Sequence, residues 1–232
     1  MATFRNASSV SFSAASSSIT KPTSLAENDV QLAFITADGT AANLSISGGA
    51  TWTQIGTTQT VSNGDTARVA LYRQVAGASE PASYTVSNSS STPCSCVLVA
   101  YSGVDTTSPI AAQLATNPNS VSPPASPVSI AANAITTTAA NQTVVWFGFV
   151  DWNTSTAAAF TDPSSTTRRA VQTPAQFSCA LAVDFVQTSA GTTGTITGTG
   201  TLSAAAGNFV AWLVALADLV PPATYSVAWI VA

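Results

Sequence analysis

The chain has 232 residues, of which 46% are hydrophobic and only 7% are charged, and its formal net charge is −4. This composition excludes intrinsic disorder, which requires low hydrophobicity and high net charge, and 6 dispersed basic residues exclude the basic stripe of a nucleic-acid-binding protein. No apolar run approaches the roughly 18 residues of a membrane span. The remaining Ser- and Thr-rich surface favours packing against neighbours, because uncharged groups cost less to desolvate than ions.

The first half of the chain predicts a series of short strands. Val10 and Phe12 alternate with serines and indicate an edge strand. The strands predicted after it are Asp29–Ala37, Ala67–Val75, Ser83–Ser87 and Cys96–Ser102. The last of these is apolar along most of its length and closes the first half.

Residues 113–127 contain four prolines among Ser and Asn, which predicts an unpaired connector. The strands predicted after this connector are Val128–Ile130, Thr143–Asp151, Thr167–Gln172, Ser178–Gln187 and Asn208–Ala217. Thr143–Asp151 is almost continuously apolar, as is typical of a strand covered on both faces. The alternation of Thr and Gly in Gly191–Gly200 predicts an exposed strand.

The two halves follow one pattern. An offset of 113 positions aligns Leu32 with Val145, Phe34 with Phe147, Asp38 with Asp151, Val97 with Val210 and Val99 with Trp212. This indicates half repeats at about 24–110 and 137–217 within a body spanning 1–218. Each half predicts too few strands to bury two faces alone, so we expect one all-β sandwich whose two sheets share a core. Phe34, Val99, Phe147 and Trp212 are predicted to face that core.

The residue types predict no catalytic, cofactor or metal site. The chain lacks histidine, which excludes a Ser-His-Asp or Cys-His system within it. The usual structural zinc site has four ligands, and the three cysteines, Cys94, Cys96 and Cys179, are one short of that number. They can also be explained as small buried side chains. Their odd number, together with a start that lacks a signal-peptide core, indicates free thiols in a reducing compartment. We therefore expect the protein not to be an enzyme.

Several polar or aromatic residues leave alternatives open. Asp38 and Asp151 fit a glycosidase carboxylate pair, a calcium site together with Asn153, or plain turn residues. Asp184 lies within a strand pattern and is expected either to face solvent or to pair with an arginine such as Arg73. Trp152 follows a predicted strand and is a candidate for stacking on a glycan.

The segment 219–232 is predicted to be a C-terminal arm or edge strand. Pro221-Pro222 ends the sandwich, because proline cannot continue a central ladder. Beyond it lies an alternating pattern with one apolar, uncharged face, made of Tyr225, Val227, Trp229 and Val231. An exposed strand of this kind must be covered. It either folds back on its own body or extends to a neighbouring subunit as an assembly interface.

The order of several motifs resembles a known family. The stretch Tyr101-Ser-Gly-Val-Asp-Thr-Thr-Ser-Pro-Ile110 resembles the most characteristic motif of jelly-roll domains in tailed-phage and prophage surface proteins. Lys21-Pro22, Asn28–Phe34, Trp52-Thr and Ala76–Val86 occur upstream in the same order. The likeness covers about residues 8–218. It implies a jelly-roll-like sandwich on the virion surface, assembled in the host cytoplasm, and the chain's extent favours a stand-alone component.

The composition and this resemblance together predict a structural protein of a bacteriophage particle. The expected role is a capsid decoration or cement protein or a head fibre, which binds the major capsid protein and self-associates, with a trimer implied by the jelly roll. No nucleic-acid or membrane partner is expected. The alternative is a receptor-binding or glycan-binding tail protein that uses Trp152, and a third class is a glycoside-cleaving enzyme that uses paired Asp residues.

Overall fold

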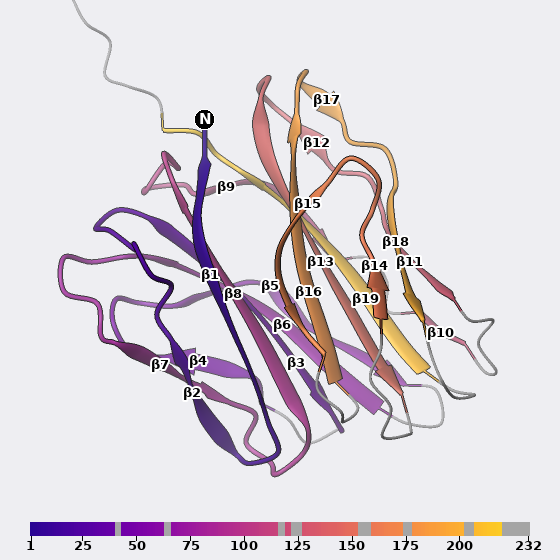
Figure 1. The fold of residues 1–232 in the computed structure, drawn as a ribbon. Helices are drawn as coiled ribbons and strands as arrows, with labels where there is room; N and C mark the ends of the chain where they lie inside the picture. Colours follow the sequence, from indigo (N-terminus) through magenta and orange to yellow (C-terminus); the bar gives the residue numbers. More distant parts are fainter. Residues whose placement is uncertain are drawn as a thin grey trace, which may run out of the picture.

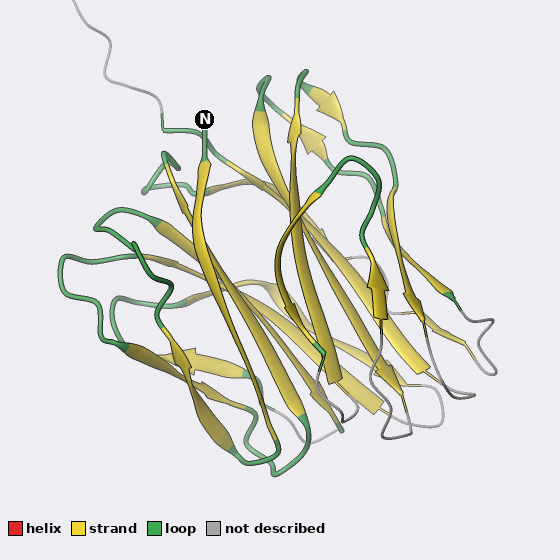
Figure 2. Ribbon diagram, in the orientation of Figure 1, coloured by secondary structure: helices red, strands yellow, loops and turns green. Residues whose placement is uncertain are grey.

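The computed structural model describes residues 1–39, 43–62, 66–115, 119–121, 127–152, 159–173, 178–201 and 207–219. In this part of the chain every regular element is a β-strand, which confirms the predicted all-β class. Figure 2 shows these strands joined by loops and turns. They stack as four layers, with two large sheets inside and a small sheet on each outer side (Figure 1).

The first half forms one inner and one outer sheet, and all their pairings are antiparallel. The inner sheet has five strands in the order β1 (Thr3–Phe12), β8 (Cys94–Ser102), β3 (Val30–Asp38), β6 (Thr66–Val75) and β5 (Thr53–Ser62). The outer sheet has three strands in the order β2 (Ser16–Thr20), β7 (Ser83–Ser87) and β4 (Ser45–Ser47).

The second half repeats this arrangement. Its inner sheet contains β19 (Gly207–Leu216), β13 (Gln142–Trp152), β16 (Ser178–Gln187) and β15 (Thr167–Gln172), with β9 (Ile110–Ala115) and β10 (Asn119–Val121) both beside β19. Its outer sheet contains β11 (Val128–Ala132), β18 (Ile196–Thr201) and β14 (Ala159–Thr161). The short pair β12 (Thr136–Thr137) and β17 (Gly191–Thr192) lies off this path.

The strand order in each half is that of a jelly roll. The first half pairs β1 with β8, β2 with β7 and β3 with β6, so one long hairpin is wrapped into two sheets. The second half pairs β9 and β10 with β19, β11 with β18 and β13 with β16 in the same places. The predicted jelly-roll-like sandwich built from two similar halves is therefore confirmed, with one small sheet more on each side than the two sheets expected.

The prediction of an unpaired connector at 113–127 is wrong in part. Gln113, Leu114 and Ala115 belong to β9, and Asn119 to Val121 form β10, all paired with β19. Together they occupy the position that β1 takes beside β8 in the first half. The prolines nearby in the sequence do not prevent this pairing, because the residues of β9 and β10 still offer backbone groups to β19.

The Thr-Gly alternation near residue 197 has a packing reason. Gly198 and Gly200 are buried while Thr197 and Thr201 are exposed, so the glycines form the inner face of β18. A Cβ atom at Gly198 would lie 3.1 Å from the Trp146 ring, and one at Gly200 would lie 2.8 Å from Val150. The outer sheet approaches the inner one closely because these positions carry no side chain. Only the Thr face of the predicted exposed strand faces outward.

Three apolar cores separate the four layers. The central core lies between the two inner sheets and contains the four residues predicted to face it, Phe34, Val99, Phe147 and Trp212. Each outer core lies between an inner sheet and its own outer sheet. The inner strands are thus covered on both faces, as their continuous apolar sequences predict. At the centre Phe34 stacks on Phe147, its equivalent in the other half, with ring centroids 5.2 Å apart.

We predict that Phe147→Ala lowers the free energy of unfolding by about 3–5 kcal/mol, because it removes a fully buried ring from the central core. Chemical denaturation monitored by circular dichroism measures this change. The control Thr85→Ala removes an exposed side chain from the outer sheet and should change stability by less than about 0.5 kcal/mol. Equal effects of the two substitutions would contradict a shared central core.

Candidate functional site

The predicted assembly residues Tyr225, Val227, Trp229 and Val231 lie outside the described part of the chain. Trp152 is the last residue of β13, and its backbone pairs with Gly207. Its side chain is not among those described, so the glycan-contact prediction stays a prediction.

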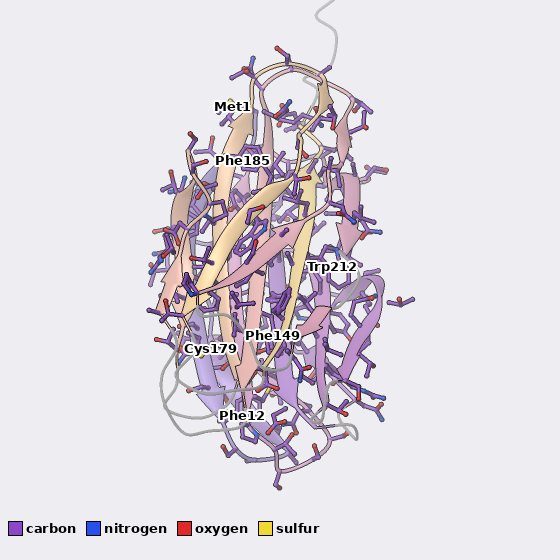
Figure 3. All side chains as sticks on the ribbon, turned by 90° about the vertical axis from the view of Figure 1, so that its right-hand side faces the viewer. Met1, Phe12, Phe149, Cys179, Phe185 and Trp212 are labelled. Carbon is purple, nitrogen blue, oxygen red and sulfur yellow. The ribbon has the colours of Figure 1, made fainter. Side chains whose placement is uncertain are left out.

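The three cysteines lie in two separate cores. Cys94 and Cys96 point to one face of β8, as the strand alternation predicts, and are buried in the outer core of the first half. Cys179 is buried in the outer core of the second half, toward one end of the molecule (Figure 3). None of the three cysteines forms a disulfide. Burial raises the pKa of the Cys94 thiol and raises that of Cys96 well above its ordinary value, which keeps both in the unreactive protonated form.

The two aligned aspartates occupy equivalent strand ends. Asp38 is the last residue of β3, and its backbone N–H donates to the carbonyl of Pro93 at 2.9 Å. Asp151 is fully buried near the end of β13 and accepts a long hydrogen bond of 3.5 Å from the Asn208 amide. No group of three acidic or cysteine side chains able to hold a metal ion gathers among the described residues.

The most developed polar site lies where the two halves meet, and it is centred on Asp184. This carboxylate is almost fully buried on β16 and accepts two hydrogen bonds of 2.8 Å from the Nε atom of Arg169 on β15. The hydroxyl of Tyr101, which comes from β8 of the first half, donates to the same carboxylate at 3.0 Å. The expectation that Asp184 pairs with an arginine is confirmed, but the partner is Arg169 from the neighbouring strand of its own hairpin and not Arg73, and the alternative that Asp184 faces solvent is wrong.

A cation–aromatic contact completes the cluster. The Arg169 guanidinium carbon lies 4.4 Å from the centre of the Phe4 ring, and Phe4 packs edge-on against the ring of Tyr101. Burial, and then the adjacent Asp184 carboxylate, raise the pKa of Tyr101 well above its ordinary value, so its hydroxyl remains a donor. These four side chains, two from each half, serve as one another's hydrogen-bond and ring-contact partners. Their arrangement fits a structural cross-link better than an acid–base pair.

A pocket of about 280 Å³ opens beside this cluster. Its walls come from residues 1–4, from Thr143, from Ser165, Thr167 and Arg169 near β15, and from Asp184, Phe185 and Val186 on β16. Figure 3 shows Met1 and Phe185 together at one end of the molecule. The lining of the pocket combines the apolar side chains of Met1, Phe185 and Val186 with the Arg169–Asp184 pair.

Through the motif near residue 101, the first half contacts the N-terminus and residues 217–219. A Cβ atom at Gly103, whose φ is +70°, would lie 2.8 Å from the carbonyl oxygen of Met1, so only glycine allows this approach. The backbone of Asp105 donates to Ala217 at 2.8 Å, and its carboxylate accepts from Thr107 at 2.7 Å. Asp218 in turn accepts a hydrogen bond of 2.8 Å from the backbone of Ala2.

No family model, curated protein or solved structure matches the chain. The likeness to phage jelly-roll domains therefore stays a prediction. Among the described residues no helix is long and apolar enough to span a membrane.

Sequence reasoning missed Arg169 and Phe4 as members of the site. A signal for Arg169 was present, because Asp184 interrupts an apolar strand and a buried carboxylate requires a partner. The adjacent predicted strand carries Arg168-Arg169, and hairpin pairing places it beside Asp184. Phe4 could not be found in this way, because β1 reaches β15 only through the packing of the two inner sheets.

We predict that Arg169→Met lowers the free energy of unfolding by about 3–5 kcal/mol, because it leaves the buried Asp184 carboxylate without its cation. Denaturant unfolding measures the loss. The matched control is Arg168→Met, which removes the more exposed pair with Asp162 and should cost less than about 1 kcal/mol. If the two variants were equally stable, the buried Arg169–Asp184 pair would contribute no more to folding than the exposed Arg168–Asp162 pair.

We also predict that no thiol of the native protein reacts with a thiol reagent at about pH 8, because all three thiols are buried and burial keeps Cys94 and Cys96 protonated. Intact-mass spectrometry should find no adduct before denaturation and 3 adducts after it. Elemental analysis should find no bound zinc. A rapidly labelled thiol in the folded protein, or a mass two units low, would contradict this expectation.

Proposed function

We propose that this protein is a structural component of a bacteriophage particle, a capsid decoration or cement protein or a head fibre, that binds the major capsid protein. The observation that carries the proposal is the chemistry of its two outer faces. The exposed side chains of the outer sheet of the first half are all hydroxyls, from Ser16, Ser18, Thr20, Ser45, Ser47, Ser83 and Thr85.

The outer sheet of the second half has a closely similar face. Strand register places Ser18, Thr85 and Ser47 side by side on one face, and Ser129, Thr199 and Thr161 side by side on the other. Hydroxyl groups cost much less to desolvate than charged groups. A body with such a face on each side suits packing between two neighbours in a lattice, which is the task of a cement protein.

The charged residues support the same proposal. Three arginines form ion pairs within the chain: Arg5 with Asp29, Arg168 with Asp162 and Arg169 with Asp184. These charges therefore have partners within the fold. The family resemblance adds the virion surface as the location of the protein. We propose self-association as well, with a trimer as the arrangement that the resemblance implies.

Antibody labelling of purified particles, paired with an outer-face variant, tests this proposal. We expect label over the whole head, and we expect Thr85→Glu to reduce incorporation, because it places a charge in the middle of the hydroxyl face. The control Thr60→Glu adds the same charge to an exposed position of β5 on the inner sheet and should leave incorporation unchanged.

Label confined to the tail would reject a decoration role and favour the receptor-binding alternative. In that case binding to a glycan array, and its loss in Trp152→Ala, would identify a glycan receptor. Particles without any label would reject both roles.

A further inference from the structure

Three of the four large hydrophobic side chains exposed in the described part of the chain gather at one end of the molecule. The large hydrophobic residues exposed in the described part of the chain are Met1 (61%), Leu219 (54%), Val186 (40%) and Leu114 (39%). Met1 and Val186 line the pocket beside Arg169. Leu219 is adjacent to them, because its backbone donates to Gly103 and Gly103 packs against Met1. Such a cluster indicates a surface that another group covers.

The same place offers an open strand edge. Strand β15 begins at Thr167, opposite Asp184, while β16 continues to Gln187. Phe185, Val186 and Gln187 therefore pair with β13 on one side and with no described strand on the other. At an open edge of this kind, beside a pocket with apolar lining residues, an extended segment can pair as a further strand.

The pocket has the size of one large side chain. Its volume of about 280 Å³ is just below the range of roughly 300–1,000 Å³ for small-molecule sites. The Arg169 guanidinium forms part of the wall, and an indole ring is the best aromatic partner for a cation. A tryptophan flanked by alternating apolar residues therefore fits both the pocket and the edge.

The chain supplies such a segment directly beside the pocket. Asp218 bonds to Ala2, which lines the pocket, so the described chain ends at Leu219 next to the pocket wall. Residues 224–232 carry the uncharged alternation that contains Trp229. Ten residues of extended chain span about 33 Å, so Trp229 can return to the pocket after the Pro221-Pro222 pair. A short tether gives an effective concentration of about millimolar, which favours the segment of the same chain over that of a second copy.

We propose that residues 224–232 bind to their own body as a strand added along the Phe185–Gln187 edge of β16, with the Trp229 side chain in the pocket beside Arg169. This inference does not depend on the proposed function. The proposal identifies a segment of the same chain as the group that fills the pocket.

Limited proteolysis of the full-length protein with chymotrypsin tests the proposal, because cleavage after Tyr225 or Trp229 follows the fraction of molecules in which the segment is released. The variant Val186→Asp places a charge at the pocket mouth and should accelerate release of the C-terminal peptide about tenfold or more, as measured by mass spectrometry. The matched control Leu114→Asp changes a residue of similar exposure on β9 and should cleave at the wild-type rate.

A second variant separates docking from folding. Trp229→Ser should accelerate cleavage after Tyr225 as Val186→Asp does, and the double variant should be no faster than the faster single one, because both remove the same contact. Both variants should lower the melting temperature slightly, because docking adds stability only to the folded body, while the body still unfolds cooperatively. Equal cleavage of wild type and Val186→Asp, or additive effects in the double variant, would overturn the proposal. Protection that disappears on dilution, together with a dimer in size-exclusion chromatography, would overturn it in favour of a second copy as the occupant.

Discussion

The fold depends on the burial of the two inner sheets against each other. Each inner sheet has two apolar faces, and its own outer sheet covers only one of them. The other face, which includes Phe34 in one half and Phe147 in the other, packs against the equivalent face of the other half. The stack of these two rings places equivalent residues in contact, as expected at the axis of an internal two-fold repeat. Neither jelly roll completes its burial alone.

Polar contacts fix how the two apolar faces are aligned. At one end Tyr101 reaches Asp184, and at the other end the hydroxyls of Thr36 and Ser178 lie 2.6 Å apart while Ser95 donates to the Ser178 carbonyl at 2.6 Å. Apolar packing alone is not directional, so two flat faces could slide or rotate relative to each other. Buried hydrogen bonds penalise such shifts, because a displaced donor or acceptor would lose its partner away from water.

The sequence allowed the strands and their faces to be predicted, because period-two patterns and continuous apolar runs report burial directly. The offset of 113 positions identified the repeat, and the structure places Val97 and Val210, aligned by that offset, in the same central core. The pairing of β9 and β10 with β19 escaped prediction, since prolines suggest a connector and the pairing joins segments about a hundred residues apart. The Phe4–Arg169 contact escaped for the same reason, because it arises only when two sheets pack.

The repeat also has a consequence for synthesis. The first half contains all its strands once Ser102 has been made, yet the face that includes Phe34 is covered completely only when the whole second inner sheet, whose last strand β19 ends at Leu216, follows. At about 5–20 residues per second, the nascent chain presents a finished sheet with one bare apolar face for roughly 6–23 s. During that interval the equivalent face of another nascent chain is a competing partner. Slow translation or crowded polysomes would therefore favour mispaired first halves, so the yield of folded protein is set partly by the ribosome.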